Sequence, residues 1–151
     1  MIEIKDIQSA VGKKLKDNGY SVIASEVKEG FPKPSCFIEV MPVNVAVENQ
    51  FYEMITDSVE ISYFPVVETK EELVSTAEHF KDVFLNTPLK VNDRYISITE
   101  INFDTDKSTL LAYFEVEFFQ ERNIETEEYP KAEILSESVV KEGYGTSENT
   151  N

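Results

Sequence analysis

Asp57-Ser-Val-Glu-Ile-Ser-Tyr-Phe-Pro65 is the stretch whose pattern decides the expected fold of this chain. Apolar residues at positions 59, 61 and 63 alternate with polar residues at 58, 60 and 62. Successive side chains of a strand point to opposite faces of a sheet, so this alternation is typical of a half-buried strand. Pro65 lacks an N–H and has a fixed φ, which suits the end of a strand. The stretch therefore predicts a central strand of a small mixed sheet.

Further strands are predicted on both sides of this stretch. Residues 20–27 are rich in β-branched side chains, and residues 35–43 carry apolar side chains toward both faces. Residues 109–119 show the strongest alternation in the chain. The pair Asn92-Asp93 tolerates positive φ and predicts a tight hairpin turn, from which a strand over residues 95–103 returns.

Residues 44–52 are harder to assign, because two signals in them conflict. The run at 45–47 is apolar enough to extend the preceding strand, but Asn49-Gln50 interrupts the pattern. We therefore expect a long bend or a hairpin tip over 44–52. The strand that follows should cover 53–64, and Thr56-Asp57-Ser58 is its weakest point, where a bend is most easily placed.

Two amphipathic helices are expected to pack on the sheet. The first has apolar residues at three- and four-residue steps and ends at Asn18-Gly19, a common helix stop. The second begins with the capping box Thr69-Lys-Glu-Glu72, in which each end residue can bond the backbone of the other, and ends at Asn86-Thr87-Pro88. The expected buried stripes are Ile4, Ile7, Val11 and Leu15 in the first helix, and Leu73, Ala77, Phe80, Val83 and Phe84 in the second.

A chain of 151 residues with 41% hydrophobic residues is long enough for one ordinary domain. We expect a single α+β domain over residues 1–122, with a mixed, mostly antiparallel sheet packed by two main helices. Residues 123–151 hold seven glutamates against two lysines, and form an acidic C-terminal extension. Two interpretations of this extension stay open: a disordered end, or an arm that docks on a neighbouring subunit by adding a strand.

The formal net charge of −15 marks the surface as acidic, which suits solubility or a position beside another polyanion. Such a surface repels phosphate, so sequence-specific nucleic acid binding is not expected. A single cysteine cannot form an internal disulfide and fits a reducing cytoplasm. We expect no export signal and, because no window approaches about 18 consecutive apolar residues, no membrane partner.

The residues give no sign of enzyme chemistry. His79 is the single histidine and should face solvent, which excludes a catalytic triad or a histidine metal cluster. Cys36 begins an apolar strand and is expected to be a small buried side chain. The five glycines are scattered, so no phosphate-binding loop exists. We therefore expect no catalytic, cofactor-binding or metal-binding residue, and a protein that works by assembling.

Three segments, in this order and spacing, carry a family resemblance: residues 30–40 (GFPKPSCFIEV), 57–65 (DSVEISYFP) and 89–95 (LKVNDRY). They resemble the small tail terminator proteins of phages and defective prophages of Gram-positive bacteria, PBSX-like prophages and phage-tail-like bacteriocins included. The resemblance covers about residues 1–122.

The resemblance implies a structural protein that forms a ring, generally hexameric, on the last ring of the tail tube. Such a ring, often called a collar, stops polymerisation, anchors the last sheath subunits of a contractile tail, and joins a head connector or closes a headless tail. It implies assembly in the host cytoplasm followed by incorporation into the virion. The alternatives are a head-to-tail connector subunit or a monomeric domain that binds a peptide or small ligand.

Loops that project from the sheet are the expected sites of subunit and partner contact. The expected contact residues are Phe31, Pro32 and Lys33 in the loop 28–34, Asn49, Gln50, Phe51 and Tyr52 in the bend, Asn92 and Asp93 in the hairpin, and Ile134 and Leu135 in the C-terminal extension.

Overall fold

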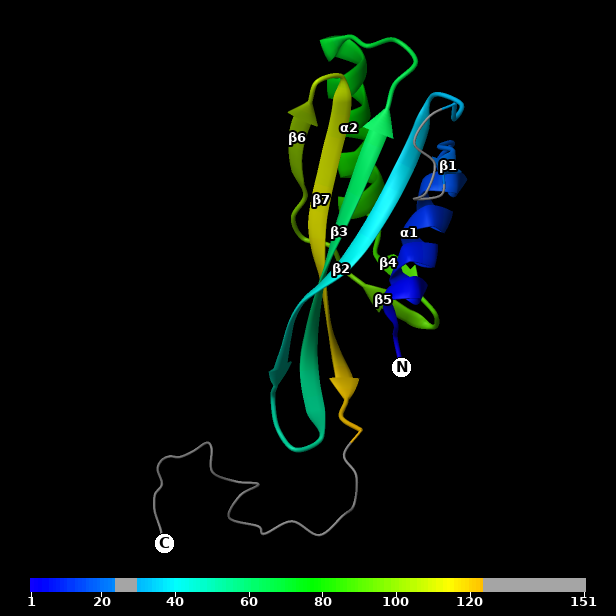
Figure 1. Cartoon of the computed structure of the whole chain (residues 1–151). Helices are drawn as coiled ribbons and strands as arrows, with labels where there is room; N and C mark the ends of the chain where they lie inside the picture. Colours follow the sequence, from blue (N-terminus) through cyan, green and yellow to red (C-terminus); the bar gives the residue numbers. More distant parts are fainter. Residues whose placement is uncertain (24–29, 124–151) are drawn as a thin grey trace, which may run out of the picture.

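The computed structural model describes residues 1–23 and 30–123 as one α+β domain, as the sequence predicted (Figure 1). The elements are α1 (Ile4–Asp17), β1 (Val22–Ile23), β2 (Ser35–Val47), β3 (Tyr52–Phe64), α2 (Lys70–Leu85), β4 (Leu89–Val91), β5 (Arg94–Ile96), β6 (Asn102–Asp106) and β7 (Thr109–Glu121).

The main sheet has the strand order β1-β2-β3-β7-β6. β1 runs parallel to β2, and every other pair in this sheet is antiparallel. β3 lies at the centre with β2 on one side and β7 on the other, which confirms the prediction for the stretch Asp57–Pro65. β4 and β5 form a separate two-stranded hairpin with Asn92 at positive φ, as its Asn-Asp turn predicted.

Both helices pack on one face of the main sheet (Figure 1). On that face Ile61 of β3 lies between Ile38 of β2 and Ala112 of β7, and all three side chains are buried. Phe84 of α2 stacks on Phe114 of β7, with 5.1 Å between the ring centroids. The buried stripes predicted for the two helices form this core, with Ile4 and Ala77 only partly buried.

At the start of α2, one of the two hydrogen bonds of the predicted capping box is formed. The Thr69 hydroxyl accepts a hydrogen bond from the Glu72 N–H at 3.2 Å. The reciprocal bond is not formed, because the Glu72 carboxylate accepts a hydrogen bond from the Tyr63 hydroxyl at 2.8 Å. Glu72 therefore ties the helix to the central strand instead of to its own N-terminus.

The three long strands extend far beyond the helices that cover them. β2, β3 and β7 have 13 residues each, or about 43 Å at about 3.3 Å per residue. The helices have 14 and 16 residues, or about 21 and 24 Å at about 1.5 Å per residue. Figure 1 shows β2, β3 and β7 continuing past both helices as a twisted three-stranded extension. We call this extension the ribbon, made of residues 41–47, 52–58 and 115–121.

Residues 44–52 contain the tip of a hairpin, which was one of the two predicted alternatives, but the predicted span was too long and no long bend is present. β2 continues to Val47, opposite β3, and leaves only residues 48–51 for the turn. The irregularity lies on β2, between Pro42 and Asn44, and not at residues 56–58 of β3. A proline has no N–H for a sheet hydrogen bond, so an extra residue is accommodated beside it.

The prediction of one strand over residues 95–103 was wrong. This segment contains most of β5 and the start of β6, which belong to different sheets. β5 pairs with β4, whereas β6 pairs with β7. Residues 97–101 connect them without regular structure, and there Ile98 is buried. Of the predicted strand 20–27, the described part contains β1 at Val22–Ile23.

Asp57 is a buried carboxylate on the covered face, at the point where the ribbon begins. Asp57 as a whole is 4% exposed, and Pro42 and Val116 lie opposite it on the two neighbouring strands. Burial raises its pKa, and no ion pair within residues 1–23 and 30–123 includes it. The folded state therefore holds the Asp57 proton more tightly than the unfolded state, and this difference lowers stability as the pH rises above about 4.

Replacing Asp57 by Asn is expected to raise the free energy of unfolding at pH 7 by about 1 kcal/mol, because a buried charge is removed. The gain should shrink toward zero at about pH 3, below the ordinary pKa of an aspartate, where the wild-type carboxyl is protonated in both states. Urea unfolding across this pH range measures the difference, with exposed Asp104→Asn as the control. Equal stability of wild type and Asp57→Asn at pH 7 would contradict the prediction.

Cys36 provides a second test of the core. Its side chain is fully buried, and burial raises the pKa of its thiol to about 12. We expect a thiol reagent to modify no cysteine in the native protein at pH 8 and one cysteine in urea, because the thiolate is the reactive form. Rapid modification of the native protein would show that the start of β2 is open to solvent.

Candidate assembly surface

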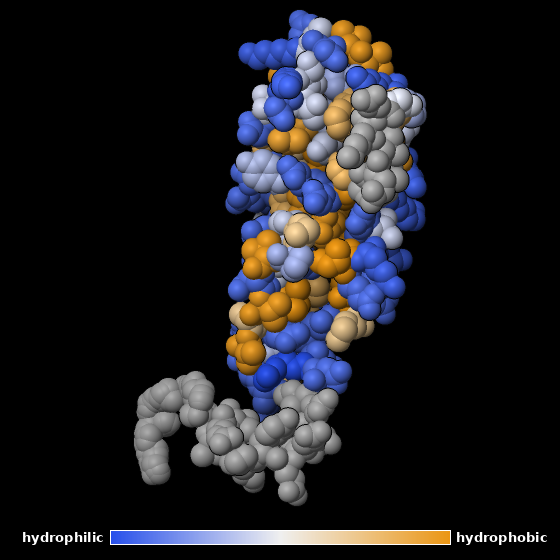
Figure 2. All heavy atoms as spheres, viewed as in Figure 1, coloured by the Kyte–Doolittle hydropathy of each residue, from blue (hydrophilic) through white to orange (hydrophobic). Residues whose placement is uncertain are grey.

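The ribbon carries apolar side chains that the described part of the chain leaves exposed. Val43, Val45 and Val47 on β2, which we call the valine strip, are 52%, 57% and 61% exposed. Phe51, in the turn after β2, is 62% exposed. Figure 2 shows hydrophobic surface gathered along the part of the molecule where the ribbon projects. Large exposed apolar patches on soluble proteins mark sites of interaction.

The turn at the end of the ribbon is held by Asn49 and Arg122. The Asn49 side-chain oxygen accepts hydrogen bonds from the N–H groups of Phe51 at 2.8 Å and Tyr52 at 2.9 Å. Arg122 donates its N–H to the Phe51 carbonyl at 2.8 Å and its guanidinium to the Asn49 carbonyl at 3.1 Å. These bonds fix the turn so that Phe51 stays exposed. Of the four residues predicted here, Asn49 holds the turn, Gln50 lies exposed in it, and Phe51 and Tyr52 present aromatic surface.

A hollow of about 600 Å³ brings the ribbon turn and the β4–β5 hairpin together. Tyr52 lines it from the ribbon, and Asn92 and Asp93 line it from the hairpin, so residues predicted separately share one surface. Arg94 and Arg122, the two arginines of the chain, line the same hollow. The Arg94 guanidinium donates to the Phe119 carbonyl at 2.7 Å, which joins the hairpin to β7.

The predicted contact loop at the other end of β2 is more closely packed. The ring of Phe31 lies 5.0 Å from that of Phe64, and Phe31 is half-buried. Lys33 forms an ion pair with Glu68 at 3.9 Å, and Pro32 is exposed. The predicted contact residues in the described part are thus divided between the two ends of a strand about 43 Å long. Ile134 and Leu135 lie outside the described residues.

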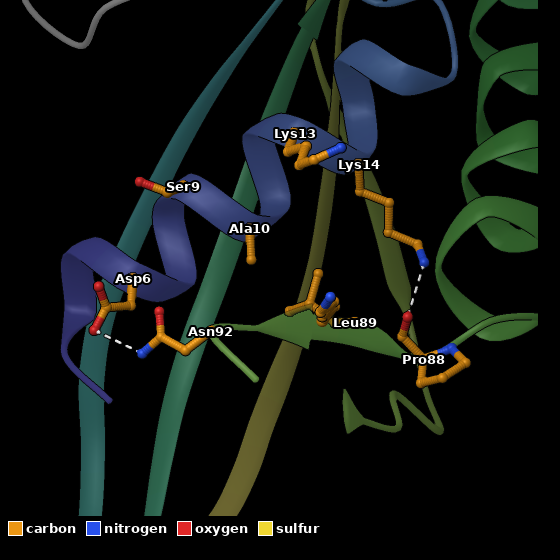
Figure 3. Close-up of a pocket in the computed structure, with 9 residues that line it drawn as sticks. Asp6, Ser9, Ala10, Lys13, Lys14, Pro88, Leu89 and Asn92 are labelled. Atoms are coloured by element: carbon orange, nitrogen blue, oxygen red, sulfur yellow. Dashed lines mark hydrogen bonds between the residues drawn. The ribbon is translucent and has the colours of Figure 1, made fainter. Parts of the chain in front are cut away.

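A second hollow, of about 440 Å³, lies between α1 and β4 (Figure 3). Lys14 donates to the Thr87 hydroxyl at 2.6 Å and to the Pro88 carbonyl at 3.1 Å, and burial lowers its pKa. At the other end of the hollow, the Asp6 carboxylate accepts a hydrogen bond from Asn92 at 3.4 Å. These polar groups form hydrogen bonds with one another. The bonds at the two ends of the hollow join α1 to the β4–β5 hairpin and to the residues just before it.

The open face of the sheet is acidic. Glu39 of β2 lies directly opposite Glu60 of β3, and Glu115 and Glu117 of β7 follow on the same face. None of the strands β2, β3, β6 and β7 contains a lysine or arginine. Like charges directly across a sheet lower stability. The carboxylates on this face therefore repel one another and lower the stability of the fold.

The described residues contain no group of three or more potential metal ligands of the histidine, cysteine, aspartate and glutamate types. His79 is exposed, and its Nδ1 atom shares a hydrogen bond with the Tyr20 hydroxyl. Burial of Tyr20 raises its pKa to about 12. Within the same described part, no helix is both long and apolar enough to cross a membrane.

Val45 and Val47 of the valine strip lie in the segment 44–52 that contains four of the predicted contact residues, but they were not among the residues named. Alternation at positions 43, 45 and 47 continues the β2 pattern after Pro42 and was the available signal. The interruption at Asn49-Gln50 lies within a turn of only four residues.

Comparison with known proteins shows the family to which this chain belongs. A family model described as phage tail terminator protein matches residues 6–138. No curated protein sequence matches the chain. Among solved structures, one aligns at 13% identity over 83% of this chain and 99% of its own, with a TM-score of 0.46. The family match spans most of the sequence and confirms the resemblance of the three segments. This chain belongs to the phage tail terminator family.

Proposed function

We propose that six copies of this chain form a ring on the last ring of the tail tube. The ring stops tube polymerisation and joins the tail to a head connector, or closes the tail where no head exists. In a contractile particle it also holds the last sheath subunits as a collar. Assembly takes place in the host cytoplasm, and the ring then remains in the particle.

The observation that carries this proposal is the exposed apolar surface of the ribbon in a chain that belongs to the tail terminator family. A closed ring needs two different surfaces on each subunit, because every copy contacts one neighbour on each side. The valine strip and Phe51 supply the first. The second lies elsewhere on the subunit, and we propose that the loop with Phe31 and Pro32, at the other end of β2, is part of it. Tail tube and sheath proteins then meet the surfaces that remain.

The acidic open face gives the ring a second property. Glu39 and Glu60 lie directly opposite each other on two strands, an arrangement that lowers stability and that a function of this face would explain. We place this face toward the lumen. A negative wall lets DNA pass without adhering, because phosphate and carboxylate repel each other.

Deletion of the gene in its own particle is expected to give tails of uncontrolled length in electron micrographs, because no ring stops the tube. Expression of the wild-type chain in trans should restore one length, and expression of an unrelated particle protein should not. Tails of normal length in the deletion strain would contradict termination. Tails of normal length that fail to join heads would indicate the connector role instead.

In a particle with a head, replacing Glu39 and Glu60 together by lysine is expected to lower DNA delivery by on the order of tenfold, because phosphate adheres to a basic wall. Tail length should stay normal. The matched control replaces Glu71 and Glu78 by lysine, since both lie exposed on α2, away from the open face. Full infectivity of the Glu39 and Glu60 double variant would place this face outside the DNA path.

A further inference from the structure

We propose that the outer edge of β2, from Val43 to Val47, accepts a strand from a second copy of this chain. The contact is main-chain pairing that extends the sheet across the subunit boundary, with the valine side chains packed against the added strand. This inference rests on the proposed ring and names the bond that holds neighbouring subunits together.

The outer edge of β2 is open along the ribbon. β1 pairs with β2 at Cys36 and Phe37, at the start of the strand, and Val43 follows six positions later. Among the strands of the described part, none pairs with the outer edge of β2 beyond Phe37. The ribbon half of this edge therefore offers unpaired backbone groups.

The hydrogen-bond pattern of the turn indicates which groups point outward. The N–H of Glu48 donates to the carbonyl of Tyr52 at 3.0 Å. Residues of an antiparallel pair alternate between bonding their partner strand and pointing away from it. Counting back from Glu48, Ala46 bonds β3, whereas Val45 and Val47 direct their N–H and carbonyl groups outward. Two residues thus combine outward backbone groups with exposed apolar side chains.

The proline and the irregularity of this edge both lie at Pro42–Asn44, and the part beyond them lacks the features with which monomeric proteins protect an exposed strand. Such edges normally carry charged side chains, lysine above all, or prolines that prevent pairing. From Val40 to Val47 the strand contains no charged residue, and its one proline, Pro42, precedes the valine strip. An unprotected edge of this kind is a site for strand addition.

The proposed ring makes a second copy of this chain the occupant, and the uncharged segment from Val40 to Val47 permits the contact. Two copies that each carry a formal charge of −15 repel each other over most of their surfaces. The segment of β2 that carries the valine strip has no carboxylate, so a second copy can approach it with less repulsion. Self-assembly is therefore least opposed by electrostatics at this edge.

Residue-resolved hydrogen exchange on the full chain tests the proposal, with monomer obtained by dilution and assembly followed by light scattering. We expect the amides of Val45 and Val47 to exchange on the order of 100-fold more slowly in the assembled protein than in the monomer. The amide of Ala46 bonds β3 and should be protected in both states, which makes it an internal control.

Val45→Lys is expected to leave the protein monomeric with an unchanged circular dichroism spectrum, because a lysine charge on the edge prevents pairing. The matched control is Val74→Lys on α2, where Val74 is 46% exposed, and this variant should assemble like the wild type. The proposal is overturned if Val45→Lys also assembles normally, or if the wild type stays monomeric at every concentration. Protection of Val45 and Val47 already in the monomer also overturns it, because the chain itself then covers the edge.

These outcomes are separate from those that test the proposed function. If Val45→Lys assembles normally but deletion of the gene still gives long tails, strand addition at β2 is wrong and termination stands. If deletion leaves tail length normal, termination is wrong whatever the exchange rates show.

Discussion

The length of the three central strands, set against the shorter helices, is the constraint on which the rest of the structure depends. Thirteen residues of strand span about 43 Å, whereas helices of 14 and 16 residues span about 21 and 24 Å. Two helices placed along one face therefore cover about half of it. The covered half forms the core, and the other half becomes the ribbon.

The two halves differ in what stabilises them. In the covered half, Ile61 and its neighbours on β2 and β7 are buried under the helices. In the ribbon, main-chain pairing persists but the valine strip has no layer above it in the described part of the chain. Asp57 and Pro42 lie where one half changes into the other. The sheet is therefore only half covered by the described part of the chain.

The elements set by local pattern were predictable from the sequence. Alternation identified β3 and β7, helical periodicity identified both helices, and Asn92-Asp93 identified its turn. The split between β5 and β6 was not predictable, because local pattern does not show which strand a segment will pair with. The Glu72 carboxylate bonds Tyr63, a tertiary contact that local capping rules do not include.

The candidate surface was predictable only in part. Spacing indicated that Tyr52 and Asn92 lie in loops, but their meeting in one hollow depends on how the hairpin packs beside β7. The exposure of Val45 was hidden for a similar reason. An apolar alternating run predicts burial, and only the helix and strand lengths together show that nothing in the described part of the chain covers it.

An electron cryomicroscopy reconstruction of the tail end of the particle tests the central claim most directly. The account predicts a closed ring of this chain in which the ribbon of each subunit is buried against its neighbour and the β2 edge continues into a neighbouring strand. A ring whose ribbons project into solvent, with the valine strip uncovered, would contradict it.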